Sequence, residues 1–371
     1  MNEIKLSAPC IFGLESVLSG EIKRIGGQNV TTTDGRVTFT GGMEMIARAN
    51  LHLYTAERVL IELGSFKARS FTELFDNVKA LPLAEFIGKD DAFPVKGHSI
   101  NSQLHSIPDC QSIIKKAVVE CLKVSYHTDW FEETGAVHQI VFNILKDEVS
   151  ICLDTSGAGL HKRGYRKNSN AAPIKETLAA GIIDLARVRL YDKLLDPMCG
   201  SGTFVVEGAY KALNIAPGLR RSFAAEKWQQ TDPSLWQTER AAAVEAINRT
   251  KEFKALGFDI DTAAVDLTIE NAKKAGVGSK VSVTEQDIRD LKPVRGAVTI
   301  CNPPYGERLL DIRQAEELYK VLGDKLAPDK DSPCYIITPH EEFEKFFGKK
   351  ADKKRKLYNG MIKCNLYMYF K

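Results

Sequence analysis

The sequence has 371 residues, and its 51 Lys and Arg against 48 Asp and Glu give a formal net charge of +3. An apolar fraction of 44% and a charged fraction of 27% are typical of globular chains and exclude a disordered tail, a collagen-like fibre and a disulfide-stapled miniprotein. No stretch approaches the roughly 18 apolar residues of a membrane span, and the N-terminus lacks the apolar core of a secretory signal, so we expect a cytoplasmic protein without a membrane partner.

Residues 1–65 alternate between strand and helix patterns. Apolar residues at helical spacing predict two helices, and alternating apolar residues predict four strands, with the helices over residues 14–25 and 43–51 and the strands over 4–8, 29–33, 36–40 and 58–63. Asp34-Gly35, between the second and third strands, is a strong hairpin signal. The resulting βαββαβ order predicts a small ferredoxin-like domain over residues 1–65.

Residues 66–158 form a second block of mixed α and β patterns. We predict helices over residues 71–78 and 110–124, and strands over residues 92–99, 137–145 and 149–153. Ser156-Gly157-Ala158-Gly159 is a plausible junction, so the next domain is expected to span residues 159–371.

The third domain alternates strands and helices, which predicts a mainly parallel, doubly wound α/β sheet. The strand candidates are residues 193–195, 255–258, 280–283, 297–301 and 334–338. The chain then changes pattern, because residues 355–358 and 361–370 flank Asn359-Gly360 as an antiparallel hairpin. A parallel sheet that ends in such a hairpin is typical of class I methyltransferases with a seven-stranded, Rossmann-like sheet.

A glycine loop follows the first strand of this domain. Asp196 ends the strand, and Gly200 and Gly202 precede a predicted helix whose N-terminus offers free N–H groups to a small anionic group. Asp259 and Asp287 follow the next two strands, where their carboxylates can accept hydrogen bonds from ribose hydroxyls and from an adenine amino group. A tight structural turn would also explain the glycines, and a helix cap would also explain Asp287.

The spacing between Asp196 and Asp259 points to an insertion. A ribose-binding acid usually lies about 20 residues beyond the loop, so residues 214–250 are extra. They include Trp228, Trp236 and a predicted helix over residues 234–250. We favour packing of the tryptophans against the core over a substrate lip.

A stiff turn follows the strand at residues 297–301. In Asn302-Pro303-Pro304-Tyr305 the two prolines cannot continue a strand, and they hold the turn at the edge where ligands of open α/β sheets bind. The Asn302 amide oxygen and the Pro303 carbonyl can accept N–H bonds from an exocyclic amine, and Tyr305 can stack on a base turned out of its helix. This chemistry suits amine methylation.

The motifs at residues 196–203 and 302–308, with His161–Arg166 and Ala172–Leu178, resemble the THUMP-domain class I RNA methyltransferases, and among them the bacterial enzymes that methylate guanine N2 in 23S ribosomal RNA. The resemblance implies a ferredoxin-like domain over residues 1–65, a THUMP RNA-binding domain over 66–158 and a methyltransferase domain over 159–371. It implies that S-adenosyl-L-methionine is held by Asp196, Gly200, Gly202, Asp259 and Asp287, with Thr177 lining the cofactor. Asn302, Pro303 and Tyr305 would hold the target base.

Charge also points to RNA. Residues 161–371 carry 36 basic and 28 acidic side chains, which predicts a polyanionic partner for the C-terminal half. Basic residues surround one aromatic ring just before the catalytic motifs, and these candidate RNA contacts are Lys162, Arg163, Tyr165, Arg166 and Lys167. The 8 cysteines form no Cys-x-x-Cys pair, so we expect no structural metal, and the oligomeric state is open, with a monomer compatible with the sequence.

Several substrates stay open at this point. The same Asn-Pro-Pro-Tyr turn serves transfer RNA guanine, DNA bases and protein glutamine, although the two N-terminal α+β units argue against DNA and protein. An RNA-binding factor that keeps the methyltransferase fold as a scaffold is the alternative from another class. We favour an enzyme that methylates guanine N2 in 23S ribosomal RNA.

Overall fold

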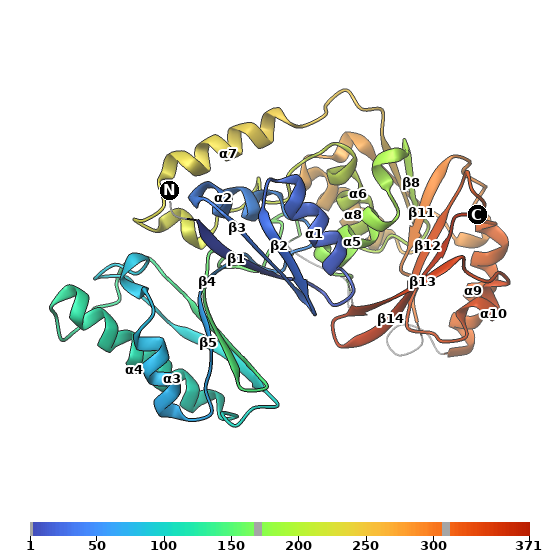
Figure 1. The fold of residues 1–371 in the computed structure, drawn as a ribbon. Coiled ribbons are helices and arrows are strands. Elements are labelled where there is room, and N and C mark those ends of the chain that lie inside the picture. The colour runs from blue at the N-terminus through green and yellow to red at the C-terminus, as the bar shows by residue number, and fades with distance from the viewer. Residues whose placement is uncertain (1–2, 167–172, 306–311) are drawn as a thin grey trace.

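The computed structural model describes residues 3–166, 173–305 and 312–371, and within them two seven-stranded sheets carry the fold (Figure 1). The first sheet has the order β2-β3-β1-β4-β7-β6-β5. Its strands are β1 (Ile4–Pro9), β2 (Gln28–Thr33), β3 (Arg36–Gly41), β4 (Leu60–Lys67), β5 (Val95–Ile100), β6 (Ile140–Leu145) and β7 (Glu148–Asp154). The helices of this part are α1 (Glu15–Arg24), α2 (Met43–His52), α3 (Phe71–Lys79) and α4 (Ile107–Tyr126).

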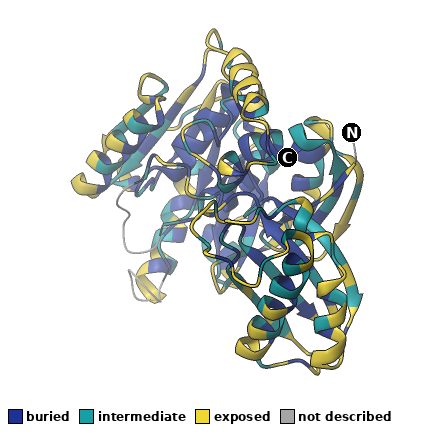
Figure 2. Ribbon diagram, turned by 90° about the vertical axis from the view of Figure 1, so that its left-hand side faces the viewer, coloured by how far each residue is buried: buried dark blue, intermediate teal, exposed yellow. Residues whose placement is uncertain are grey.

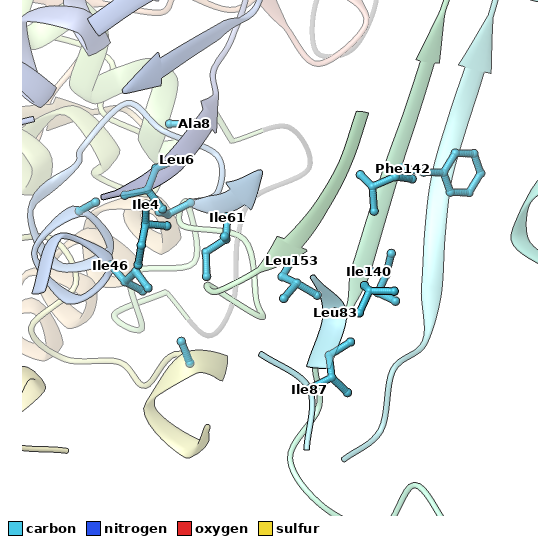
Figure 3. Packing of buried hydrophobic residues seen from close by; sticks show 14 of the residues in the cluster. Ile4, Leu6, Ala8, Ile46, Ile61, Leu83, Ile87, Ile140, Phe142 and Leu153 are labelled. Carbon is cyan, nitrogen blue, oxygen red and sulfur yellow. The ribbon is translucent and has the colours of Figure 1, made fainter. Parts of the chain in front are cut away.

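Strand β4 joins the two N-terminal units into this single sheet. It pairs antiparallel with β1 of the first unit and antiparallel with β7 of the second. A row of buried side chains crosses the join, because Leu6 pairs with Ile61, Ile61 with Leu153, and Leu153 with Ile140 (Figure 3). Sequence patterns predicted two separate units and did not predict that they share a strand. The boundaries at 65/66 and 158/159 stay a prediction.

The second sheet has the order β10-β9-β8-β11-β12-β14-β13. Its strands are β8 (Lys193–Asp196), β9 (Lys254–Asp259), β10 (Val281–Glu285), β11 (Ala297–Cys301), β12 (Cys334–Thr338), β13 (Lys353–Asn359) and β14 (Ile362–Tyr369). Pairs among β8 to β12 are parallel, whereas β14 runs antiparallel to β12 and β13. The helices are α5 (Glu176–Leu185), α6 (Thr203–Ala212), α7 (Pro233–Glu245), α8 (Thr262–Ala275), α9 (Ile312–Leu326) and α10 (Phe343–Phe347). The predicted class I methyltransferase architecture is confirmed.

The final hairpin turns one residue later than predicted. Asn359 pairs with Ile362, so the two loop residues are Gly360 and Met361 rather than Asn359 and Gly360. Gly360 has φ +64°, and a positive φ at the first loop position is the type II′ geometry that glycine favours. The Asn-Gly signal therefore located the turn but not its register.

The insertion at residues 214–250 packs against the N-terminal sheet domain. Helix α7 lies on α2, and it ends at Glu245 rather than at residue 250. Trp228 and Trp236 are buried in the hydrophobic core of the N-terminal units, and not in the core of the methyltransferase sheet. The prediction that they are packing residues therefore holds, but the core that they join is a different one.

Buried polar contacts join the first unit to the third domain. Lys211 Nζ on α6 lies 2.8 Å from Glu21 Oε1 on α1 and 3.4 Å from Asp184 Oδ1 on α5. The Tyr54 hydroxyl donates to the Ile215 carbonyl at 2.6 Å. Buried residues run through the middle of the molecule, and exposed residues lie on its outer helices (Figure 2).

Candidate active site

The glycine loop between β8 and α6 has two residues in the left-handed region. Gly200 has φ +53° and Gly202 has φ +80°. A Cβ atom on Gly202 would lie 2.5 Å from Cγ2 of Thr268, so a larger residue requires a shift of α8. Gly202 is the N-cap residue of α6, which places the free N–H groups of this helix at the loop.

Hydrogen bonds from β9 and α8 fix the loop in place. Gly200 N donates to Asp259 Oδ2 at 2.8 Å, and Cys199 N donates to the Phe258 carbonyl at 2.8 Å. From α8, the Thr268 hydroxyl donates to the Gly200 carbonyl at 2.7 Å. The loop backbone is thus held before any ligand binds.

The loop opens into a cavity of about 820 Å³ at the carboxyl edge of the parallel strands. Seven of the predicted site residues line it together, namely Asp196, Gly200, Asp259, Asp287, Asn302, Pro303 and Tyr305. Gly202 is not on the wall and acts through the loop conformation. The volume is within the range of about 300–1,000 Å³ that small-molecule sites occupy.

The cavity wall is acidic. The wall includes one guanidinium, Arg289, which pairs with Asp287 at 2.9 Å, and five carboxyl groups, those of Asp196, Asp259, Asp261, Asp287 and Glu317. Burial raises the pKa of Asp196 to about 8, against the opposing effect of a backbone N–H bond from Met198. A cation placed beside Asp196 would stabilise its ionised form, so the wall suits a positively charged ligand.

Backbone N–H groups orient the two predicted nucleoside-binding carboxylates. Asp259 Oδ1 accepts from Asp261 N at 3.1 Å, while its Oδ2 accepts from the loop. Asp287 Oδ1 accepts from Arg289 N at 2.8 Å, and this hydrogen bond lowers the pKa of Asp287. Asp287 therefore also caps a short 3-10 helix, and its Oδ2 accepts from Arg289 Nη1 at 2.9 Å on the cavity wall.

The Asn-Pro-Pro-Tyr turn lies next to the glycine loop. Strand β11 is buried along its whole length and pairs with β8, with Thr299 beside Leu195. Since both strands are parallel, Asn302 leaves the same edge of the sheet as Asp196. Asn302 is half-buried, whereas Pro303 and Tyr305 are buried against the wall.

Thr177 does not lie on the cavity wall. Its side chain is buried, and its hydroxyl donates to Glu57 Oε1 of the first unit at 2.5 Å. Burial would raise the pKa of Glu57, but hydrogen bonds from His161 and Thr177 and the charge of Lys175 outweigh burial and lower it to about 2. The expected cofactor contact of Thr177 is therefore replaced by a contact between domains.

The predicted RNA contacts at residues 162–167 differ in how far they are exposed. Arg163 and Tyr165 are 2% and 1% exposed, so their predicted contacts with RNA are wrong. Arg163 Nη2 donates to the Tyr54 carbonyl at 2.6 Å, and the Tyr165 hydroxyl donates to Glu207 Oε1 at 3.0 Å. Arg166 is half-buried and binds Thr203 and Glu176, and Lys162 is exposed. Lys167 lies outside the described residues.

The sequence patterns missed several wall residues. Asp261 and Ile260 follow Asp259 at the same strand end, and this position was a usable signal. Gln314 and Glu317 come from α9, one helical turn apart, and no sequence feature linked that helix to the glycine loop.

Family profiles match three consecutive parts of the chain. An RlmL ferredoxin-like domain matches residues 5–60, and a THUMP domain matches residues 68–154. The methyltransferase domain described as RMKL-like matches residues 163–368, which is more than half of the chain. This chain belongs to the RMKL-like methyltransferase family. The predicted resemblance to THUMP-domain class I methyltransferases is thereby confirmed.

Individual curated relatives match over almost the full chain. The Bacillus subtilis protein named "Putative RNA methyltransferase YpsC" is 41% identical and is covered over 97% of its length. A "Ribosomal RNA large subunit methyltransferase K/L" from Psychromonas ingrahamii is 35% identical, and this chain spans 49% of its length. Other K/L relatives are likewise matched over about half of their length.

A solved structure matches the whole fold. It is the structure of "SMU.472, a putative methyltransferase complexed with SAH", at 39% identity and a TM-score of 0.94, covering 100% of this chain and 98% of that chain. Among the described residues of our chain, no helix is long and apolar enough to cross a membrane, and no group of three or more His, Cys, Asp and Glu is arranged to hold a metal ion.

Proposed function

We propose that this chain transfers a methyl group from S-adenosyl-L-methionine to the exocyclic N2 of a guanine in RNA, with 23S ribosomal RNA as the favoured substrate. The observation that carries the proposal is the common cavity of the glycine loop and the Asn302–Tyr305 turn. Family membership supports the coarser statement, that the chain is an S-adenosylmethionine-dependent RNA methyltransferase.

The residues on the wall fit this cofactor. S-adenosylmethionine carries a sulfonium and an ammonium, and the acidic wall around Asp196 and Asp259 complements both charges. The left-handed glycine loop lets a ligand approach the backbone, and the N-terminus of α6 suits the ligand's carboxylate. When bound, the cofactor supplies an electrophilic methyl group. Asp259 would accept from the ribose, and Asp287 from the adenine amino group.

The turn would prepare the amine for attack. The Asn302 amide oxygen and the Pro303 carbonyl accept N–H bonds from the target nitrogen, which favours a pyramidal nitrogen with its lone pair aimed at the methyl group. The two prolines hold these acceptors in place, so attack costs little reorganisation. Tyr305 would stack on the extruded base. The methylated amine is cationic and releases its proton readily, so the reaction needs no strong base.

The THUMP match supports RNA as the substrate, and the names of the K/L relatives support ribosomal RNA. Transfer RNA guanine is the second candidate, because a THUMP domain does not distinguish the two RNAs. The chain spans about half the length of its K/L relatives, so we do not assign their full activity to it. Lys162, exposed at the entry to the methyltransferase domain, stays a proposed RNA contact.

The proposal is tested with tritiated S-adenosylmethionine and total RNA from a strain that lacks the protein. Labelled RNA is fractionated and digested, and we expect the label in N2-methylguanosine from the 23S fraction. Label in the transfer RNA fraction would select the second candidate. Label in another nucleoside, or cofactor binding without transfer to any RNA, would contradict the proposal.

A further inference from the structure

The insertion at residues 214–250 contacts the THUMP domain through Trp228. Its Nε1 donates to the Val137 carbonyl at 3.0 Å, and its ring stacks on His138 with centroids 4.3 Å apart and an interplanar angle of 21°. Within the described residues, the hydrogen bonds and ring contacts between residues 66–153 and the methyltransferase domain all come from this insertion.

The surface that receives Trp228 is rigid. His138 is fully buried, and its Nδ1 lies 3.4 Å from Asp91 Oδ2. Asp91 in turn accepts from Gly88 N at 2.7 Å and from Ala136 N at 3.0 Å. Trp228 itself is 2% exposed, so its contact is a packed joint and not a loose surface contact.

The other end of the insertion is fixed to the ferredoxin-like domain. Glu239 on α7 accepts two N–H bonds from Arg48 on α2, at 3.0 Å from Nε and 2.6 Å from Nη2. Trp236 stacks on Phe223 within the insertion, with centroids 5.4 Å apart. The insertion leaves from the C-terminus of α6, and α6 begins at the glycine loop. One segment therefore links the cofactor loop to both N-terminal domains.

Apart from this joint, the THUMP domain is held by strand β4 and by the segment after β7, where Asn50 Nδ2 donates to Thr155 Oγ1 at 2.8 Å and Ser156 Oγ donates to Asn50 Oδ1 at 2.6 Å. The pairing of β4 with β7 is irregular between Glu62 and Gly64, just where the two N-terminal units meet. Such an irregularity bends and twists a strand. The bend lies next to these attachments, and the contact of Trp228 with Val137 and His138 adds a further one that restrains the angle of the THUMP domain.

We propose that Trp228 is a positioning residue, which sets the orientation of the THUMP domain and thereby selects the nucleotide that reaches Asn302. The inference rests on the proposed RNA substrate. Trp228 does not line the cavity that holds the glycine loop and the Asn302–Tyr305 turn. It therefore acts only through the THUMP domain, which it orients. A misplacement of about 1 Å at the reacting atoms can lower a rate by about 10²-fold, so a small rotation of the THUMP domain is enough.

The test compares Trp228→Ala, Trp228→Phe and His138→Gln with the unchanged chain. For Trp228→Ala we expect kcat/KM on RNA to fall about 10- to 100-fold, with the Kd for S-adenosylmethionine within about twofold, and methyl groups to appear at neighbouring guanines. Trp228→Phe keeps the stacking and should recover most of the native position. Trp236→Ala is the matched control, because it removes a buried tryptophan whose ring stacks within the insertion, on Phe223.

A second readout does not depend on methyl transfer. Spin labels at Val124 on α4 and Met361 in the final hairpin, both exposed, report the distance between the two domains. We expect a broader distance distribution in Trp228→Ala and His138→Gln, and a native one in Trp236→Ala. Native distances together with native site selection in Trp228→Ala would overturn the inference. Broader distances in a chain that methylates no RNA would support the part of the inference that concerns the orientation of the THUMP domain, and would refute the selection of a nucleotide together with the proposed function.

Discussion

At the scale of single residues, Asp196 has the least ordinary environment in the cavity. It is 1% exposed, and burial raises its pKa to about 8. In the free protein at neutral pH the carboxyl group therefore holds its proton. A sulfonium or ammonium bound beside it would favour the carboxylate, so cofactor binding and proton release are coupled.

This coupling predicts a pH-dependent affinity for S-adenosylmethionine. Between about pH 6 and pH 8 binding must remove the proton from Asp196, so affinity should rise with pH, by at most about tenfold per unit, and level off above pH 8. Titration calorimetry at several pH values measures the effect. Asp196→Asn should bind more weakly and show a flatter profile. A flat profile in the unchanged chain would show that cofactor binding does not change the protonation of Asp196.

A substitution at Asn302 should affect the target amine without affecting cofactor binding. Asn302→Ala removes one preorganised acceptor from the target amine, so we expect turnover to fall by about 10²-fold or more. Cofactor affinity should stay near that of the unchanged chain, because the glycine loop is intact. Single-turnover transfer measures the turnover, and calorimetry measures the cofactor affinity. Equal turnover in the variant and the unchanged chain would show that Asn302 has no role in the reaction.

Residue roles were predictable where the backbone pattern marks a strand end. Asp196 and Asp259 end their strands, Asp287 and Asn302 follow theirs, and parallel strands bring these ends to one edge. Arg163 and Tyr165 were misjudged because local charge does not reveal burial. Their partners, Tyr54 and Glu207, are distant in sequence, and only the packed structure brings them together.

At the scale of elements, the turn from β8 into α6 is the most demanding. Gly202→Ala would force a side chain into the left-handed region and against Thr268, so we expect a loss of about 1–3 kcal/mol of unfolding free energy and weaker cofactor binding. Gly360→Ala is the matched control, because its φ is +64° but no atom lies within 4 Å of the added Cβ. Chemical denaturation should show the smaller loss for Gly360→Ala. Equal losses would mean that the contact with Thr268 contributes nothing.

Most elements were predictable because their patterns are local. The 3.6- and 2-residue periods locate the helices and strands within a few residues, as for α3 and β7. The pairing of these helices and strands with one another was harder to predict from the sequence. The contact of α7 with α2 and the pairing of β4 with β7 depend on contacts across more than 80 residues, which no local pattern encodes.

At the scale of the whole molecule, a buried ionic cluster ties the first unit to the methyltransferase domain. Lys211 and Glu21 are 5% and 4% exposed at their side chains, and the Lys211 ammonium lies 3.9 Å from the centroid of the Tyr54 ring. Glu21 also accepts from the Tyr54 and Thr55 backbone N–H groups, at 3.1 and 3.0 Å. These contacts should make the two parts unfold together.

Lys211→Met tests this cluster. It keeps the length of the side chain but leaves Glu21 and Asp184 without their shared cation, and breaking a buried pair typically costs about 3–5 kcal/mol. We expect calorimetry to show a lower transition temperature for both domains at once. The exposed pair of Lys274 and Glu270 gives the control, since Lys274→Met should cost about 0.5 kcal/mol or less. If only one transition shifted, the two domains would unfold independently, and the prediction would be wrong.

The strand shared by the two N-terminal units constrains how the chain can be divided. β4 has β1 on one side and β7 on the other, so a cut on either flank strips one unit of its neighbour and bares a row of backbone amides and carbonyls. Such a bare edge recruits strands from other chains. We therefore expect either fragment to aggregate when it is expressed alone, and evolution or engineering can exchange the two units only as a pair.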